Sequence, residues 1–137
     1  MINKKELKVA LVTDSLFKMA GGAKVLEAFA ELLPNSDIFT LFACSKKSRV
    51  RKLSESINSH KIITSKLNVI PFIEKFYRFT LPLWPFEIEK FDFSSYDLVI
   101  SSSWAVSHGV ITLLDTFHLA YVHTPMRYIW DMYELYF

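Results

Sequence analysis

The 137-residue chain has one cysteine, Cys44, three glycines and no apolar run near the length of a membrane span. A single cysteine excludes an internal disulfide and is typical of a reducing compartment. A transmembrane helix needs about 18 or more apolar residues in a row, which this chain does not contain. Its N-terminal MINKKELK leads into a short strand rather than a long apolar region, so no signal peptide is predicted. We therefore expect a cytoplasmic protein.

The formal net charge of +2 is too small to indicate nucleic-acid binding. The stretch KKSRVRK nonetheless concentrates five basic residues: Lys46, Lys47, Arg49, Arg51 and Lys52. A solvated loop or helix face explains this run, and contact with anionic lipid head groups or a diphosphate is the alternative. The hydrophobic content of 51% is high for a small domain. Either apolar surface meets a membrane, or the chain is part of something larger.

The first half of the chain reads as strand, helix and strand within a single domain. Lys8 to Thr13 is a β-branched apolar run, typical of a strand buried on both faces. Residues 21–33 have apolar residues at helical spacing, Leu32 among them, and Pro34 stops this helix. Asp37 to Phe42 is a second strand, so these elements form a βαβ unit with a right-handed crossover.

The second half continues the alternation. Strands are predicted at His60–Thr64, Tyr96–Ser103 and His118–Val122. Residues 71–81 are predicted to form one helix with a broad apolar face, ended by Pro82 and Pro85; the face consists of Phe72, Ile73, Phe76, Tyr77 and Phe79. A last helix begins at Pro125 with Thr124 as its N-cap. The expected fold is α/β: a Rossmann-like open parallel sheet with helices on both faces.

Gly21 and Gly22 form the first candidate site. Adjacent glycines let backbone approach a ligand closely, and a helix N-terminus behind them offers amide donors to an anion. A tight turn explains them equally well. GxGxxG and GxxxxGK[ST] are both absent, and no acidic residue ends the second strand, where the chain reads Leu41-Phe42-Ala43. These absences argue against an NAD site and against a P-loop ATP site.

The second candidate is SSSWAVSHG, residues 101–109, at the carboxyl end of a predicted strand. Ser102 and Ser103 there could bond a polar ligand. The alternative is a polar strand end over which Trp104 packs as a lid. No G-x-S-x-G elbow is present, so a Ser-His-Asp triad is not predicted.

His123 is the third candidate. In HLAYVHTPMRYIWD the apolar run Leu119 to Val122 indicates a buried strand that ends on His123, directly before the predicted helix. Open α/β sheets bind ligands at this edge, and the dipole of a helix N-terminus keeps an imidazole neutral. A structural histidine is the alternative. Metal binding is not predicted, because no two histidines stand at ligand spacing and there is one cysteine.

Three segments together resemble a known family: GGAKVLEAFAELLPNSDIFTLF, LPLWPFEIEKFDFSSYDLVISSSWAVSHGVIT and HLAYVHTPMRYIWDMYELYF. They are similar to the N-terminal domain of family 4 glycosyltransferases, in particular the mannosyltransferase-like enzymes of bacterial surface polysaccharide synthesis. The similarity covers nearly the whole chain from Lys8 onward. It implies the two-domain GT-B architecture and metal-independent, retaining transfer of a hexose from a nucleotide diphosphate sugar. It also implies that this domain binds the acceptor, whereas a C-terminal domain binds the nucleotide and carries a pair of glutamates.

Carried over by position, the resemblance implies that Gly21 and Gly22 line the cleft near the donor phosphates or the acceptor. It implies that His123 reaches the transferred sugar, and that Arg127 makes a salt bridge or a phosphate contact. Three positions depart from the family pattern: Lys24, where a glutamate is common, Trp104, where a histidine is common, and His108, where a basic residue is common. These departures bear on substrate identity more than on fold.

The chain ends at Phe137, so we expect an incomplete N-terminal domain without its nucleotide-binding partner. The implied acceptor is a lipid-linked glycan, which would bring the protein to the anionic inner face of the membrane; no cofactor or metal is implied. The alternatives are a non-catalytic or split-enzyme subunit that binds glycan, lipid or a partner chain, and an unrelated Rossmann-like binding domain. An apolar face that a second domain normally covers is expected to promote self-association.

Overall fold

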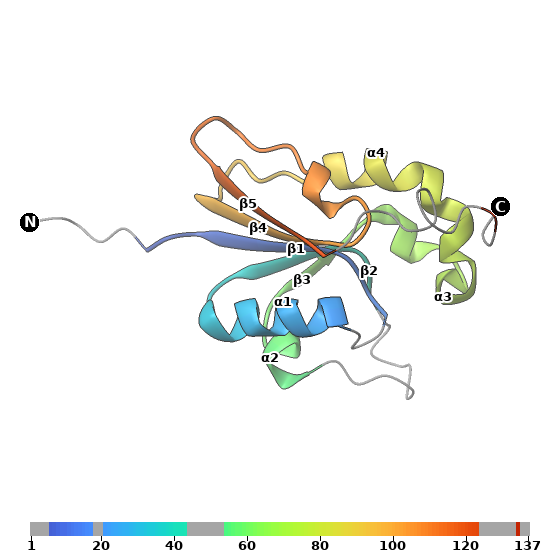
Figure 1. Ribbon diagram of the computed structural model, residues 1–137, viewed down its shortest axis with the longest axis horizontal. Coiled ribbons are helices and arrows are strands. Elements are labelled where there is room, and N and C mark those ends of the chain that lie inside the picture. Colours follow the sequence, from blue (N-terminus) through green and yellow to red (C-terminus); the bar gives the residue numbers. More distant parts are fainter. Residues whose placement is uncertain (1–5, 18–20, 44–53, 124–133, 135–137) are drawn as a thin grey trace, which may run out of the picture.

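The computed structural model describes residues 6–17, 21–43, 54–123 and 134. Its elements in chain order are β1 (Val9–Leu16), α1 (Gly21–Leu32), β2 (Asp37–Ala43), α2 (Glu55–Asn58), β3 (Ile62–Thr64), η1 (Lys66–Val69), α3 (Ile73–Phe76), η2 (Tyr77–Leu83), α4 (Trp84–Glu89), β4 (Leu98–Ser103), η3 (Ser107–Gly109) and β5 (Phe117–Val122), with η marking 3-10 helices. The strands form one all-parallel sheet in the order β3-β2-β1-β4-β5 (Figure 1). This confirms the predicted open α/β sheet. Among the described residues, no helix is long and apolar enough to span a membrane.

Helices cover both faces of the sheet, with α1 and α2 on one side and α4 on the other (Figure 1). Successive strand residues point to opposite faces, which sorts the core into two clusters. On the first face, Leu11 and Ile100 of the sheet pack with Leu26 of α1 and Ile57 of α2. On the second face, the α4 residues Trp84 and Ile88 pack with the strand residues Ala10, Val12, Phe39 and Val99.

The buried stripe of α1 differs in detail from the predicted one. Ala23, Leu26 and Ala30 are buried, whereas Leu32 is 76% exposed. Alanines let the helix backbone lie close to the sheet, so the stripe follows the small residues at spacings of three and four. Leu32 occupies the last helical position and points outward. The prediction of Leu32 on the apolar face was wrong in that sense.

The single helix predicted for residues 71–81 is wrong as well. The chain there forms α3, then η2, which contains Pro82, then α4 with Pro85 in its first turn. Phe72 has a left-handed φ of 58°, which breaks the approach to α3. An α-helix cannot accommodate Pro82 in its interior, but a first turn accommodates Pro85. The two prolines therefore divide the segment instead of ending it.

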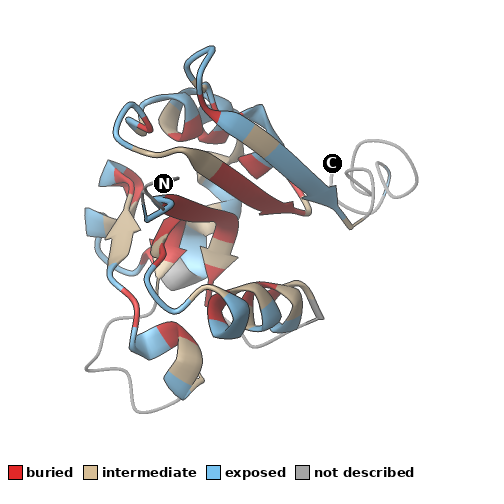
Figure 2. Cartoon of the chain, turned by 90° about the vertical axis from the view of Figure 1, so that its left-hand side faces the viewer, coloured by how far each residue is buried: buried red, intermediate tan, exposed pale blue. Residues whose placement is uncertain are grey.

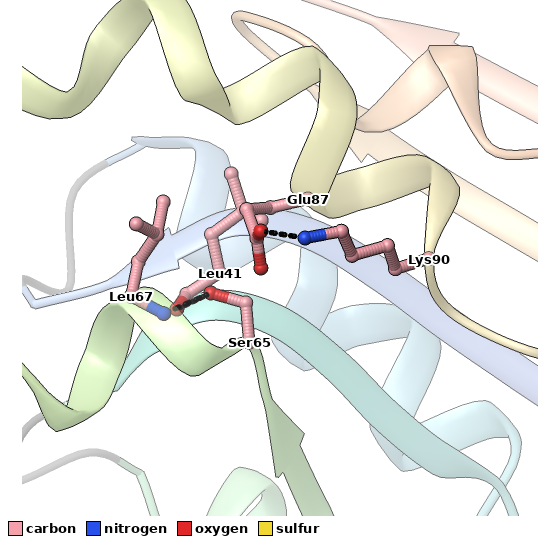
Figure 3. Close-up of polar contacts among 5 residues, drawn as sticks. All are labelled: Leu41, Ser65, Leu67, Glu87 and Lys90. Atoms are coloured by element: carbon pink, nitrogen blue, oxygen red, sulfur yellow. Dashed lines mark hydrogen bonds and ion pairs between the residues drawn. The ribbon is translucent and has the colours of Figure 1, made fainter.

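The predicted apolar face of that segment is mostly outside the core. Ile73 is buried, but Phe72, Phe76 and Phe79 are exposed. Helical spacing of phenylalanines marks one face and does not tell which way that face points. The turn before this segment is fixed by Ser65, whose hydroxyl donates to Leu41 O (2.9 Å) and accepts from Leu67 N (3.3 Å) (Figure 3).

The fifth strand lies where the sequence predicts, but it is not buried. Within the part of the chain that the structure describes, β5 pairs with β4 alone, from Leu98↔Phe117 to Ser103↔Val122, and forms an edge of the sheet. Phe117 is 70% exposed, and Leu119 and Tyr121 are exposed too (Figure 2). A run of apolar residues looks the same in the sequence whether the strand is central or at the edge of a sheet. The described residues include no layer that covers the apolar side chains of β5.

Candidate functional site

The order in which the chain adds strands to the sheet reverses between β1 and β4. From β1 the chain passes through α1 to β2 on one side, and it later returns to place β4 and β5 on the other side. Open α/β sheets bind ligands in the crevice at the carboxyl ends of strands at such a switch point. Gly22, Ser102 and His123 all lie at this edge: Gly22 follows β1, Ser102 is near the end of β4, and His123 follows β5.

The structure brings these three predicted residues together. Ser102 Oγ lies 2.7 Å from His123 Nε2, and Ser102 is fully buried. His123 is fixed further by its backbone N–H, which donates to Ser103 O (2.9 Å), and by the Tyr121 ring, 4.9 Å away centroid to centroid. A Cβ built on Gly22 would lie 3.6 Å from His123 Nε2. The glycine therefore faces the imidazole directly.

Gly22 has no conformational reason to be glycine. Neither its φ nor that of any other described glycine is positive. An added Cβ would make ordinary van der Waals contacts, at 3.6 Å to His123 and 3.9 Å to Trp104 Cδ1. Glycine inside a helix costs up to about 1 kcal/mol relative to alanine. An alanine methyl would therefore fit beside His123, and the fold itself does not require glycine at this position.

Each of the three consecutive serines at the end of β4 bonds one histidine. Besides the Ser102–His123 pair, Ser101 Oγ lies 2.8 Å from His118 Nε2, and Ser103 Oγ lies 2.8 Å from His108 Nδ1. Alternation along the strand puts Ser102 on the α1 face and the other two serines on the α4 face. Ser103, a predicted ligand contact, therefore points away from the Ser102–His123 pair.

Sequence reasoning missed the role of Asp14. This buried carboxylate lies in the polar part of β1, between Thr13 and Ser15, and four consecutive backbone N–H groups of the loop after β4 donate to it. The donors are Trp104 (2.9 Å), Ala105 (3.0 Å), Val106 (2.7 Å) and Ser107 (2.8 Å), and the Ser107 hydroxyl adds a fifth bond at 3.3 Å. Burial raises the pKa of Asp14, and the four backbone hydrogen bonds oppose that rise.

Asp14 thereby shapes the wall of the site. The loop it holds begins with Trp104, whose ring lies against the Gly22 position and makes an edge contact with the buried Trp84 ring at 5.7 Å. This confirms that Trp104 packs at the strand end, as the lid alternative predicts.

Other predicted site residues lie outside the described residues: Thr124, Arg127, Lys46, Lys47, Arg49, Arg51 and Lys52. Within the described ranges, no group of three or more His, Cys, Asp or Glu side chains could hold a metal ion. An open cavity of about 260 Å³ between Glu89–Ser94 and Ile111–Leu113 lies before β4 and β5, at their amino ends. It is therefore remote from His123.

His118 predicts a pH-dependent stability. Burial lowers its pKa from the ordinary 6.5, and the charge of neighbouring His108 lowers it further. Between the lowered folded value and 6.5 the unfolded chain binds more protons, so the free energy of unfolding falls as pH falls through this window. His118→Gln keeps a polar partner for Ser101 but does not titrate. Urea unfolding from about pH 8 to pH 5 should show a shallower loss in this variant, and parallel curves would contradict the assignment.

Comparisons with known protein families, with curated proteins and with solved structures find no match for this chain. What the site can do follows from its own residues. They offer a histidine held by a serine, an open position beside it at a helix N-terminus, and an aromatic wall fixed by a buried carboxylate. This set suits a ligand that forms hydrogen bonds with the histidine. The rest of the ligand would be an apolar part against the aromatic wall or an anionic group at the helix N-terminus.

Proposed function

We propose that the chain is the acceptor-side half of a retaining glycosyltransferase, which moves a hexose, such as mannose, from a nucleotide diphosphate sugar to a lipid-linked glycan. The observation that carries this proposal is the Ser102–His123 pair, which lies beside Gly22 at the switch point, the edge where open α/β sheets bind ligands. The resemblance implies that His123 reaches the reacting sugar at this edge.

His123 is the group for the sugar in this proposal. The Ser102 hydroxyl occupies Nε2, the ring nitrogen on the Gly22 side, so the atom left to bond a sugar hydroxyl is Nδ1, on the other side of the ring. If Ser102 donates to Nε2, Nδ1 carries the proton and donates; if Ser102 accepts, Nδ1 accepts. In both cases the hydrogen bond to Ser102 fixes the orientation of the imidazole ring, and Nδ1 can bond a sugar hydroxyl. A Nδ1 contact of this kind needs no metal, in keeping with the metal-independent reaction that the resemblance implies.

The N-terminus of α1 contributes less than the donor needs. A helix N-terminus stabilises a nearby anion by about 0.3–1 kcal/mol, and by about 2 when the contact is partly buried. Micromolar binding requires about 8 kcal/mol. Base and ribose contacts must therefore come from a nucleotide-binding domain, which the resemblance places outside this chain.

Transfer assays with the chain alone, and with a C-terminal nucleotide-binding domain supplied, test the proposal. We expect the chain alone to show neither transfer nor donor binding by calorimetry at sub-millimolar concentrations, and the combined domains to transfer sugar. Transfer by the purified, monomeric 137-residue chain would contradict the division of roles. Absence of transfer with every donor and acceptor offered to the combined domains would favour the non-catalytic alternative.

The substitution Gly22→Ala distinguishes an effect on ligand binding from an effect on the stability of the fold. Because the methyl fits the protein and favours a helix, the melting temperature should stay level or rise. In the combined enzyme the methyl fills the space beside His123, so kcat/KM should fall roughly tenfold, the effect of one extra methyl in a fitted pocket. Gly109→Ala, with nothing within 4 Å of its added Cβ, is the control. Unchanged kcat/KM in Gly22→Ala would show that no ligand uses the open position.

A further inference from the structure

Seven large apolar side chains are exposed between η1 and the end of α4. They are Val69, Ile70, Phe72, Phe76, Phe79, Leu83 and Phe86, and residues 69–86 are called here the aromatic segment. Phe72 is 73% and Phe79 is 82% exposed. Single exposed apolar residues are ordinary on protein surfaces, but such a concentration marks an interaction surface.

The exposed rings stand on a packed base. Ile73 and Trp84 are buried, and Tyr77 stacks on Trp84 with centroids 6.2 Å apart. Trp84 Nε1 donates to Thr80 Oγ1 (3.0 Å), and the Thr80 hydroxyl donates to Tyr77 O (2.6 Å). The segment is therefore anchored to the core on its inner side, which fixes the direction of the outer side chains.

Phe72 is held in an unfavourable backbone conformation. Its φ of 58° is one that a bulky side chain rarely adopts, and its ring is not buried in return. Strained residues of this kind concentrate at functional positions, where the surrounding structure enforces them. Phe72 thus combines a left-handed backbone with a ring that is mostly exposed.

Two basic residues, Lys75 and Arg78, and one acidic residue, Glu74, stand among these rings in the sequence. Lys75 Nζ lies 5.9 Å from the centroid of the Phe72 ring, and the Arg78 guanidinium lies 5.9 Å from that of Tyr77. Phe76 and Phe79 contact each other, with centroids 6.2 Å apart. The acid Glu87 is largely covered and ion-paired with Lys90 (Figure 3), while Glu89 is exposed at the far end of α4. Rings with interleaved cations are the composition that suits an anionic membrane surface.

We propose that the aromatic segment docks on an anionic bilayer, with Phe72, Phe76 and Phe79 entering the boundary between head groups and acyl chains and Lys75 contacting lipid phosphates. A second protein surface fits less well, because the cores of protein interfaces are depleted in lysine. The docking rests on residues 69–86 alone. It requires neither glycosyl transfer nor the basic run at 46–52.

Co-sedimentation of the full chain with vesicles tests this proposal. The chain should bind vesicles of phosphatidylcholine mixed with phosphatidylglycerol. The double variant Phe76→Ser/Phe79→Ser should lower the partition coefficient by about tenfold or more, because two large apolar side chains lose their contact with lipid. Lys75→Glu should weaken binding to the mixed vesicles but should not change binding to vesicles of phosphatidylcholine alone. The effect on the mixed vesicles should become smaller at high salt.

Leu32→Ser and Leu114→Ser provide matched controls, since both leucines are exposed apolar residues outside the aromatic segment. They should bind vesicles as the unmodified chain does, and melting curves check that every variant is folded. Three results would overturn the proposal: no binding of the unmodified chain to mixed vesicles, normal binding of the Phe76/Phe79 variant, or an effect of that variant on self-association alone in sedimentation velocity. The vesicles contain no glycan, so this outcome is independent of the transfer assays.

Discussion

Replacing Asp14 by alanine should lower the free energy of unfolding by about 3–5 kcal/mol. The change removes the acceptor of four backbone N–H groups and one hydroxyl in a buried loop. Each buried donor left unpaired costs about 1–3 kcal/mol, and the loop recovers part of this by relaxing toward water. Urea unfolding monitored by circular dichroism gives the difference directly.

Two further variants make this result specific. Asp14→Asn keeps one acceptor oxygen but turns an amide NH2 toward the same N–H groups, so its loss should lie between those of the alanine variant and the unmodified chain. Asp92→Ala removes a carboxylate that also accepts a backbone N–H, from Ser94 at 2.9 Å, but at the surface. We expect a much smaller effect there, because water replaces the lost bond. An Asp14→Ala chain that unfolds at the urea concentration of the unmodified chain would refute the role given to this carboxylate.

The Asp14 contacts also connect stability to the site. The loop that the Asp14 carboxylate holds places Trp104 beside Gly22. Among the described residues, no other buried carboxylate accepts hydrogen bonds from this loop. A weakened Asp14 variant should therefore show altered Trp104 fluorescence before it unfolds globally. Asp14 is a positioning residue in this view, because it acts on the site through the loop.

The sheet was predictable because its signals are local. β1 and β2 are β-branched or apolar runs, and a helical pattern separates them at the length of a βαβ unit. The right-handed crossover and the binding edge at the strand ends then follow from general rules of parallel sheets. This reasoning was enough to select Gly22, Ser102 and His123, which the structure brings together.

The remaining features depend on contacts between distant residues. Asp14 and Trp104 are 90 positions apart, and an aspartate after an apolar run looks like the end of a strand, although β1 continues to Leu16. The partners of the three serines lie 5, 17 and 21 positions away, on η3, on β5 and just beyond β5. The outward direction of Phe72 depends on one backbone torsion. None of these leaves a periodic trace in the sequence.

His123→Ala should lower kcat by about a hundred- to a thousandfold in the combined enzyme, the effect of losing one well-placed hydrogen bond to the transition state, worth roughly 2.7–4 kcal/mol. The melting temperature should fall by only a few degrees, because removing the partly buried imidazole leaves the buried Ser102 hydroxyl without this partner, at a cost of about 1–3 kcal/mol. Steady-state kinetics with saturating donor and acceptor measure kcat separately from KM.

Ser102→Ala should give a smaller loss of kcat, since it leaves the imidazole in place and removes only the bond that fixes the orientation of the ring. His108→Ala is the matched control: this histidine is also bonded to a serine of β4, but on the opposite face of the sheet. Its kcat should remain near that of the unmodified enzyme. If His123→Ala and His108→Ala instead lower the melting temperature alike and leave turnover near normal, both histidines serve the fold, and the sugar must be held by other residues of the site.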